Sequence, residues 1–142
     1  MNQLFITFRD FWSQFKNPFT GRDVGAFQEG SVSVISGNTQ RPPPFPYIVY
    51  PISLPSFAEN AMINVTVWDK GSQPGFYPVI NAIVEQISDL ITEDGIILKL
   101  GDGKGAIWLQ RGTPFVIYPP GDDRDLTIVR AVLNIVVRGY IA

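Results

Sequence analysis

The stretch between residues 61 and 91 changes its hydrophobic period from two to about 3.6, and this change constrains the fold more than any other feature. Apolar and polar residues alternate up to Trp68, which is typical of a β-strand with one buried face. The segment Asp69–Gly75 then carries turn-forming residues. From Pro78, which the first turn of a helix tolerates, apolar residues recur at helical spacing, and Gly95 suits the helix exit. A strand and a helix that each have one apolar side predict a core in which the two pack together.

Composition excludes several classes of protein. The chain has 142 residues, 45% of them hydrophobic and 17% charged, so we expect one globular domain over residues 1–142. It contains no cysteine and no histidine, and therefore lacks the residues of disulfides, thiolate metal sites and the commonest general base. A net charge of −2 argues against a protein that grips nucleic acid phosphates. We expect no enzyme activity, no cofactor and no metal. An enzyme built on carboxylates or lysine is the alternative, but no carboxylate pair lies where it must converge.

The first residues predict an amphipathic helix from about Gln3 to Phe15, within an N-terminal segment 1–16, that ends at Asn17–Pro18. Its apolar side is expected to pack on the sheet or on a neighbouring subunit. Binding at a membrane interface is disfavoured, because such helices usually carry many basic residues and the segment 1–16 has only Arg9 and Lys16. No apolar run could span a bilayer and the start lacks the basic region of a signal peptide, so we expect a cytoplasmic protein that contacts no membrane.

Residues 17–46 predict an extended loop or arm, with at most a short strand at Ser31–Ile35. The run Arg41–Pro46 must be extended and polyproline-like; a stiff connector is favoured over a ligand for an aromatic groove. The residues Tyr47–Leu54 have the composition of a strand. Because Pro51 cannot donate to a strand ladder, we expect an edge strand, or one that ends or bulges there.

A glycine cluster at Gly101–Gly105 separates two strand-like runs, Ile96–Leu100 and Ala106–Gln110. It lacks the serine or threonine and the following helix of a phosphate-binding loop, so we predict a β-hairpin turn. The acidic run Asp122–Asp125 lacks the spacing of a calcium loop and predicts a solvated turn. Glycine-rich segments without apolar anchors, including Gly21–Gln40, are expected to be flexible. The candidate flexible loop residues are Gly71, Gly75, Gly101, Asp102, Gly103 and Lys104.

The last predicted strand, around residues 128–138, has two different faces. Its odd positions are wholly apolar and should face the core, whereas its even positions mix arginine and asparagine with valine. The strand before the central helix has the same mixed second face, which suggests that this side of the sheet is also covered, by the N-terminal helix or by another copy of the protein. The predicted core contains Val65, Val67, Ile83, Ile87, Leu133 and Ile135. The candidate interface with another subunit or a partner contains Met62, Trp68, Arg130, Asn134 and Arg138.

The order of these elements and several local phrases resemble the tail terminator, or tail completion, proteins of long-tailed bacteriophages, whose relatives are often called minor capsid or neck proteins. The resemblance covers roughly residues 45–141 and the first helix, whereas residues 21–40 have no counterpart in it. The phrases that carry it are Phe45–Tyr50, Asn64–Lys70, the helix with Val79, Ile83 and Leu90, and Arg111–Phe115.

The resemblance implies an α/β (α+β) fold, with a mostly antiparallel sheet of about four or five strands, an N-terminal helix and one central amphipathic helix. It implies a virion protein of the tail or neck, assembled in the host cytoplasm, that forms a homo-hexameric ring. The ring would end polymerisation of the tail tube, contact the head connector and let DNA pass through its lumen. Another neck or tail assembly protein, such as a head-closure or tube-forming subunit, is the alternative.

Overall fold

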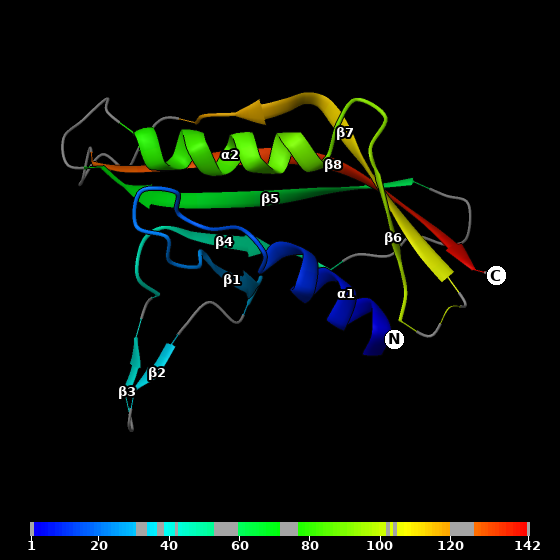
Figure 1. The fold of residues 1–142 in the computed structure, drawn as a ribbon, viewed down its shortest axis with the longest axis horizontal. Helices are drawn as coiled ribbons and strands as arrows, with labels where there is room; N and C mark the ends of the chain where they lie inside the picture. The colour runs from blue at the N-terminus through cyan, green and yellow to red at the C-terminus, as the bar shows by residue number, and fades with distance from the viewer. Residues whose placement is uncertain are drawn as a thin grey trace.

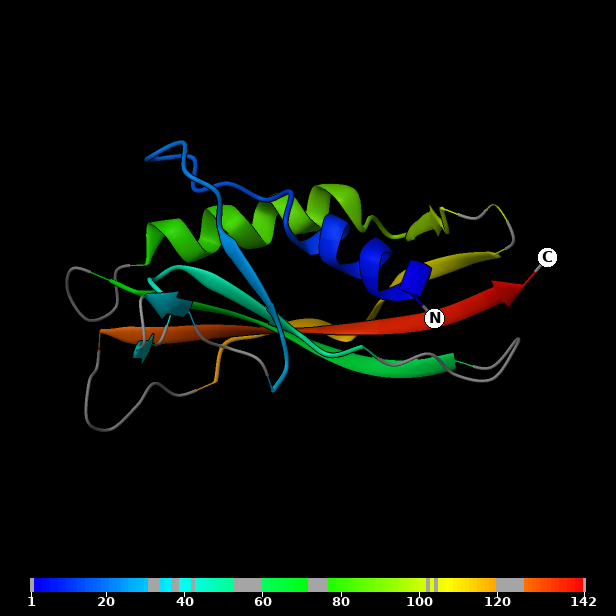
Figure 2. The same cartoon turned by 90° about the horizontal axis from the view of Figure 1, so that it is seen from below.

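The computed structural model describes residues 2–30, 34–36, 39–41, 43–52, 60–71, 77–101, 103, 105–119 and 127–141. It shows an α+β fold in which two helices lie on one face of a six-stranded mixed sheet (Figures 1 and 2), beside a separate two-stranded sheet. Neither described helix is long and apolar enough to cross a membrane. The elements are α1 (Asn2–Trp12), β1 (Gly25–Gln28), β2 (Val34–Ser36), β3 (Thr39–Arg41), β4 (Tyr47–Tyr50), β5 (Asn60–Lys70), α2 (Pro78–Leu90), β6 (Ile96–Lys99), β7 (Gly105–Ile117) and β8 (Ile128–Ile141).

The strand order of the main sheet is β1-β4-β5-β8-β7-β6. The central pair is β5 and β8, which run antiparallel and are paired along the whole of β5. All other neighbours are also antiparallel except β1, which runs parallel to β4. The expected mostly antiparallel sheet is therefore confirmed, but the expected four or five strands were too few.

The core lies between the helices and the odd positions of β5 and β8. All six residues predicted for it have an exposed fraction of 0%, so the prediction that the central helix packs on these two strands is confirmed. Full burial of an aliphatic side chain contributes about 1.5–3 kcal/mol, so this layer supplies much of the stability.

Charged side chains from strands of the sheet lie at the two ends of the central helix α2. Its own first turn has no acid and its last turn no base, and Tyr77 provides no side-chain cap. The buried carboxylate of Asp69, at the end of β5, accepts a hydrogen bond from the N–H of Ile80 in the first turn. At the other end, the guanidinium of Arg111 on β7 donates to the carbonyl oxygens of Ile91 and Ser88, at 2.6 and 2.9 Å. An anion at the N-terminus and a cation at the C-terminus both match the helix dipole.

The N-terminal helix is shorter than expected, since it ends at Trp12 instead of Phe15, and it lies on the same side of the sheet as α2 (Figure 2). Phe8 and Trp12 have exposed fractions of 0%, and the Trp12 ring stacks on that of Tyr50, with 6.4 Å between centroids. Packing of this helix on the sheet is confirmed. The alternative prediction, in which this helix covers the opposite face of the sheet, is wrong, because its aromatic side packs in the core.

The segment expected to be an extended arm contributes three strands. Residues 25–28 form β1 at one edge of the sheet, so β4 has a neighbour on each side and the prediction of an edge strand was wrong. The alternative that the strand ends at Pro51 is confirmed, since β4 stops at Tyr50. Val24 is 2% exposed, so this segment does have an apolar anchor. Part of the short strand expected at Ser31–Ile35 is β2, which pairs with β3; residues 31–33 lie outside the described residues.

The predicted hairpin is confirmed, because β6 and β7 pair antiparallel around the glycine cluster. Leu100 donates its N–H to the Gly105 carbonyl at 2.9 Å, and Gly103 adopts a φ of 72° in the turn. Gly95 has a φ of 78°, and a Cβ there would lie 2.5 Å from the Leu109 carbonyl oxygen. Both its backbone angle and this close approach therefore require glycine.

Candidate functional site

The face of the sheet opposite the helices is the main candidate site, and we call it the open face. In the antiparallel register, Trp68 of β5 is paired with Arg130 of β8, and Asn64 with Asn134. Met62 is 56% exposed, whereas Trp68, Arg130, Asn134 and Arg138 are half-buried. The five residues predicted for the subunit interface therefore lie on one face, which none of the described residues covers with a helix. A role in subunit contact stays a prediction.

An aromatic row crosses the open face from β4 to β8. The rings of Phe45 and Tyr47 lie 5.4 Å apart between centroids, and Tyr47 stacks on Trp68 at 6.4 Å. On the far side of Trp68, the Arg130 guanidinium lies over the indole ring, 5.5 Å from its centroid. Burial in this row raises the pKa of Tyr47. Trp68 therefore lies between an aromatic neighbour from β4 and a cationic neighbour from β8.

The bulge of β7 meets the open face at Asn134, whose side-chain amide donates to the Pro114 carbonyl oxygen at 2.8 Å. A Cβ on Gly112 would lie 3.0 Å from the Asn134 Cβ and 3.1 Å from the Met62 sulfur. Glycine at this position thus lets the bulge approach the two central strands closely. The arginine-glycine-threonine-proline phrase that carries part of the family resemblance forms this bulge.

Cations gather on the open face. Four basic side chains occupy its strand positions, and no aspartate or glutamate does so on the strands as far as the structure describes them. The net charge of −2 gave no sign of this, because charge totals carry no information on position. The cations are Lys70, Lys99, Arg130 and Arg138.

Sequence reasoning missed part of the open face. Phe27, Phe45, Tyr47 and Lys99 belong to strands or connections whose register with β5 and β8 cannot be read locally. The sequence of β4, in which each face carries one tyrosine and one aliphatic residue, indicated only that neither side of this strand is polar.

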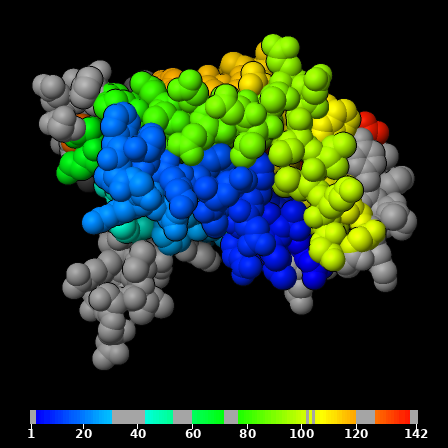
Figure 3. Space-filling view, in the orientation of Figure 1, coloured from blue at the N-terminus to red at the C-terminus, as the bar shows by residue number. Residues whose placement is uncertain are grey.

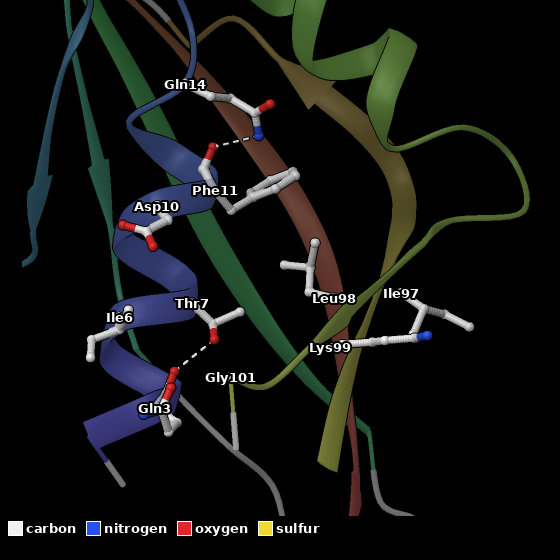
Figure 4. A pocket seen from close by; sticks show the side chains of 10 residues that line it. All are labelled: Gln3, Ile6, Thr7, Asp10, Phe11, Gln14, Ile97, Leu98, Lys99 and Gly101. Atoms are coloured by element: carbon white, nitrogen blue, oxygen red, sulfur yellow. Dashed lines mark hydrogen bonds between the residues drawn. The ribbon is translucent and has the colours of Figure 1, made fainter. Parts of the chain in front are cut away.

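A groove of about 460 Å³ lies on the other side of the molecule, between α1 and β6 (Figure 4). Its polar wall is used by the helix itself: the Thr7 hydroxyl donates to the Gln3 carbonyl at 2.6 Å, and the Gln14 amide donates to the Phe11 carbonyl at 2.8 Å. Lys99 points away from α1 in Figure 4. No acid and base converge here among the residues that the structure describes.

The described residues contain no group of three or more acidic side chains that could hold a metal ion. Asp69 is the one buried carboxylate among them, and burial raises its pKa from 3.8, opposed by hydrogen bonds from the backbone of Lys70 and Ile80. Because the Asp69 carboxylate accepts a hydrogen bond from the first turn of α2, we assign it a role in capping that helix. The expected absence of catalytic residues, cofactor and metal stays a prediction.

The candidate flexible residues are only partly described. Gly75, Asp102 and Lys104 lie outside the described residues, as does the acidic turn Asp122–Asp125. Among the others, the Gly71 N–H donates to the Thr127 carbonyl at 2.8 Å, and a Cβ on Gly101 would lie 2.5 Å from the Gln3 side-chain oxygen. Their flexibility stays a prediction.

Comparisons with protein-family models, curated proteins and solved structures found no match to the chain. The resemblance to phage tail terminators therefore depends on the residues and element order already described. The open face, with its aromatic row and its cations, is the feature on which a function can be argued.

Proposed function

We propose that the protein is a structural virion subunit that forms a ring on the end of a phage tail tube, ends tube polymerisation and provides a surface for head joining. The open face is the observation that carries this proposal. It combines an exposed methionine, an aromatic row and arginines, and interfaces between proteins are enriched in these residue types.

Self-association gives the open face a physical role. Valines and an exposed methionine alternate with arginines along the centre of the sheet, whereas a face seen only by water needs no such apolar centre. Apolar residues with polar groups around them are typical of the contact surfaces between proteins. In the assembled virion the same subunits would also meet the tube protein and the head connector, with DNA passing through the lumen.

Another neck or tail assembly protein, such as a head-closure or tube-like subunit, is the second candidate. The same open face supports it, because a tube subunit also needs a large lateral contact. The two candidates differ in growth: a terminator stops at one ring, whereas a tube subunit continues to add rings.

Electron microscopy of the purified protein over a range of concentrations tests the proposal. Closed rings of one diameter that do not lengthen with concentration would support it. Continuous tubes would favour the second candidate, and monomers at every concentration would contradict self-assembly.

A charge-reversed variant, R130E/R138E, links the assembly to the open face. It should stay folded but fail to close rings, and tails made with it should be abnormally long. The variant R9E/R22E, which makes the same change of charge at exposed positions on and after α1, should form normal rings. Normal rings and tails with R130E/R138E would exclude the open face as the contact.

A further inference from the structure

The exposed side of α2 and the turn after it form an acidic ridge. Glu85 and Asp89 are one helical turn apart and exposed, and Glu93 and Asp94 follow, also exposed. No lysine or arginine occurs between residues 77 and 98. Figure 3 shows α2, in green, at the surface on the helix side of the molecule.

Two cations in segments that contact α2 are already engaged. The Lys16 ammonium pairs with the Asp23 carboxylate at 3.7 Å, although its backbone is hydrogen-bonded to Gln86 of α2. The Arg111 guanidinium is directed at the carbonyl oxygens at the C-terminal end of α2. The exposed carboxylates of the ridge are therefore left without a cationic partner among these two groups.

The acidic ridge and the cationic open face lie on opposite layers of one subunit, with the sheet and the core between them (Figure 2). Among the described residues, the charged side chains of α2 and the turn after it are therefore all acidic, whereas those at the strand positions of the open face are all basic. Complementary patches on one chain can meet only between copies, because the core keeps them apart within a subunit.

We propose that the open face of one copy docks on the acidic ridge of α2 of the next copy. The proposal rests on the self-assembly proposed above and names the surface that the open face contacts. Such a contact is heterologous: each subunit uses a different surface toward each neighbour, and the assembly closes into a ring when the rotation between copies permits it. Complementary potentials at such a contact set the register and suppress wrong pairings.

The aromatic row disfavours a nucleic acid as the occupant of the open face. Sequence-independent binding of single strands needs free ring faces on which bases stack. Tyr47 and Arg130, on the two strands that flank β5, both contact the ring of Trp68, so this central ring is already engaged within the chain. A protein surface that brings carboxylates to the arginines and apolar groups to the ring edges fits this geometry better.

A charge-exchange experiment tests the docking. Three variants are compared with the unchanged protein by sedimentation velocity at low and high salt: R130E/R138E on the open face, E85K/D89K on the ridge, and the fourfold variant that carries both changes. Each double variant places like charges on both surfaces, and its association should weaken by at least about 100-fold. The fourfold variant exchanges the two signs and should recover most of the association, and in all cases high salt should reduce the differences.

Circular dichroism checks that each variant is folded, and R9E/R22E controls for the change in net charge made by R130E/R138E. Normal association of E85K/D89K, or no recovery in the fourfold variant while the unchanged protein still forms rings, would overturn the docking but leave the ring proposal intact. Recovery of open filaments in place of rings would support the docking and contradict the ring. An unchanged protein that stays monomeric, or binds single-stranded DNA on its open face, would overturn both.

Discussion

The two faces of the central sheet use charged residues in opposite ways. On the helix-covered face of the described strands, the charged side chains are Asp69 and Arg111, and both cap α2. On the open face, four cations lie among apolar and aromatic residues, with no carboxylate on the described strands. The charges on the first face cap a helix of the same subunit, whereas those on the second lie on a face that no described helix covers.

The same contrast is visible within a single strand. In β8 the odd positions from Val129 to Val137 are at most 8% exposed, and the even positions between them are half-buried. Neither set is fully solvated, so the alternation does not separate inside from outside. It separates a surface covered by the chain's own helices from one that is only partly covered, and the open face is therefore the more informative about function.

The largest expected effect is on the helix-covered face. Leu133→Ala should lower the free energy of unfolding by about 2–5 kcal/mol, because it removes a fully buried side chain and leaves a cavity under α2. Val132→Ala, at the adjacent open-face position, should cost less than about 1 kcal/mol in the monomer. Urea denaturation of both variants measures the difference. Equal losses would show that the two faces are equally buried in solution.

The part of the fold that local pattern encodes could be predicted from the sequence. The change of period between residues 61 and 91 predicted β5 and α2 because each pattern spans several turns or pleats. The β6–β7 hairpin could be predicted as well, because its glycine turn is a local signal between two strand-like runs. By contrast, β1 has only four residues and joins the sheet through parallel pairing with β4, a non-local contact that no short pattern indicates.

The candidate site was predictable in the same partial way. Alternation alone placed Met62 with Trp68, and Arg130 with Arg138, on one side of their strands. It did not say which side the N-terminal helix covers, because an amphipathic helix fits either apolar face; the stack of Trp12 on Tyr50 decides it. The aromatic row and the cationic character of the open face depend on the register between strands. This register cannot be read from the sequence alone.

Loss of a cap should have the next largest effect. Arg111→Ala removes both charge-assisted hydrogen bonds at the end of α2 and should cost about 1.5–3 kcal/mol. Arg111→Lys should recover only part of this loss, because a single ammonium does not reproduce the planar fork of a guanidinium. Thermal denaturation followed by circular dichroism compares the two. No loss in Arg111→Ala would mean that water satisfies these carbonyl groups equally well.

An arginine of the open face should matter much less to the folded subunit. Arg130→Ala removes the guanidinium over Trp68 and should cost about 0.5–1 kcal/mol in the monomer. The assembly, in contrast, should be strongly weakened if this face is the contact. Denaturation at a concentration where the protein is monomeric, compared with sedimentation at high concentration, separates the two quantities. A loss of monomer stability as large as that of Arg111→Ala would erase the proposed contrast between the faces.

The smallest expected effect concerns the charge of Asp69. Burial raises the pKa of this carboxyl in the folded state above 3.8, so the folded protein holds the proton more tightly than the unfolded chain. Binding of this proton therefore stabilises the folded state. The contribution is fully present below pH 3.8 and is lost as the pH rises through the folded-state pKa.

Asp69→Asn keeps an acceptor for the Ile80 N–H but carries no charge, so its stability should match that of the wild type at low pH and exceed it slightly at neutral pH. Asp69→Ala removes the acceptor as well and should be less stable than Asp69→Asn at every pH. Urea denaturation of the three proteins between pH 3 and pH 7 measures both differences. A less stable Asp69→Asn at neutral pH would show that the ionised carboxylate, through the N-terminus of α2, stabilises the helix by more than its burial costs.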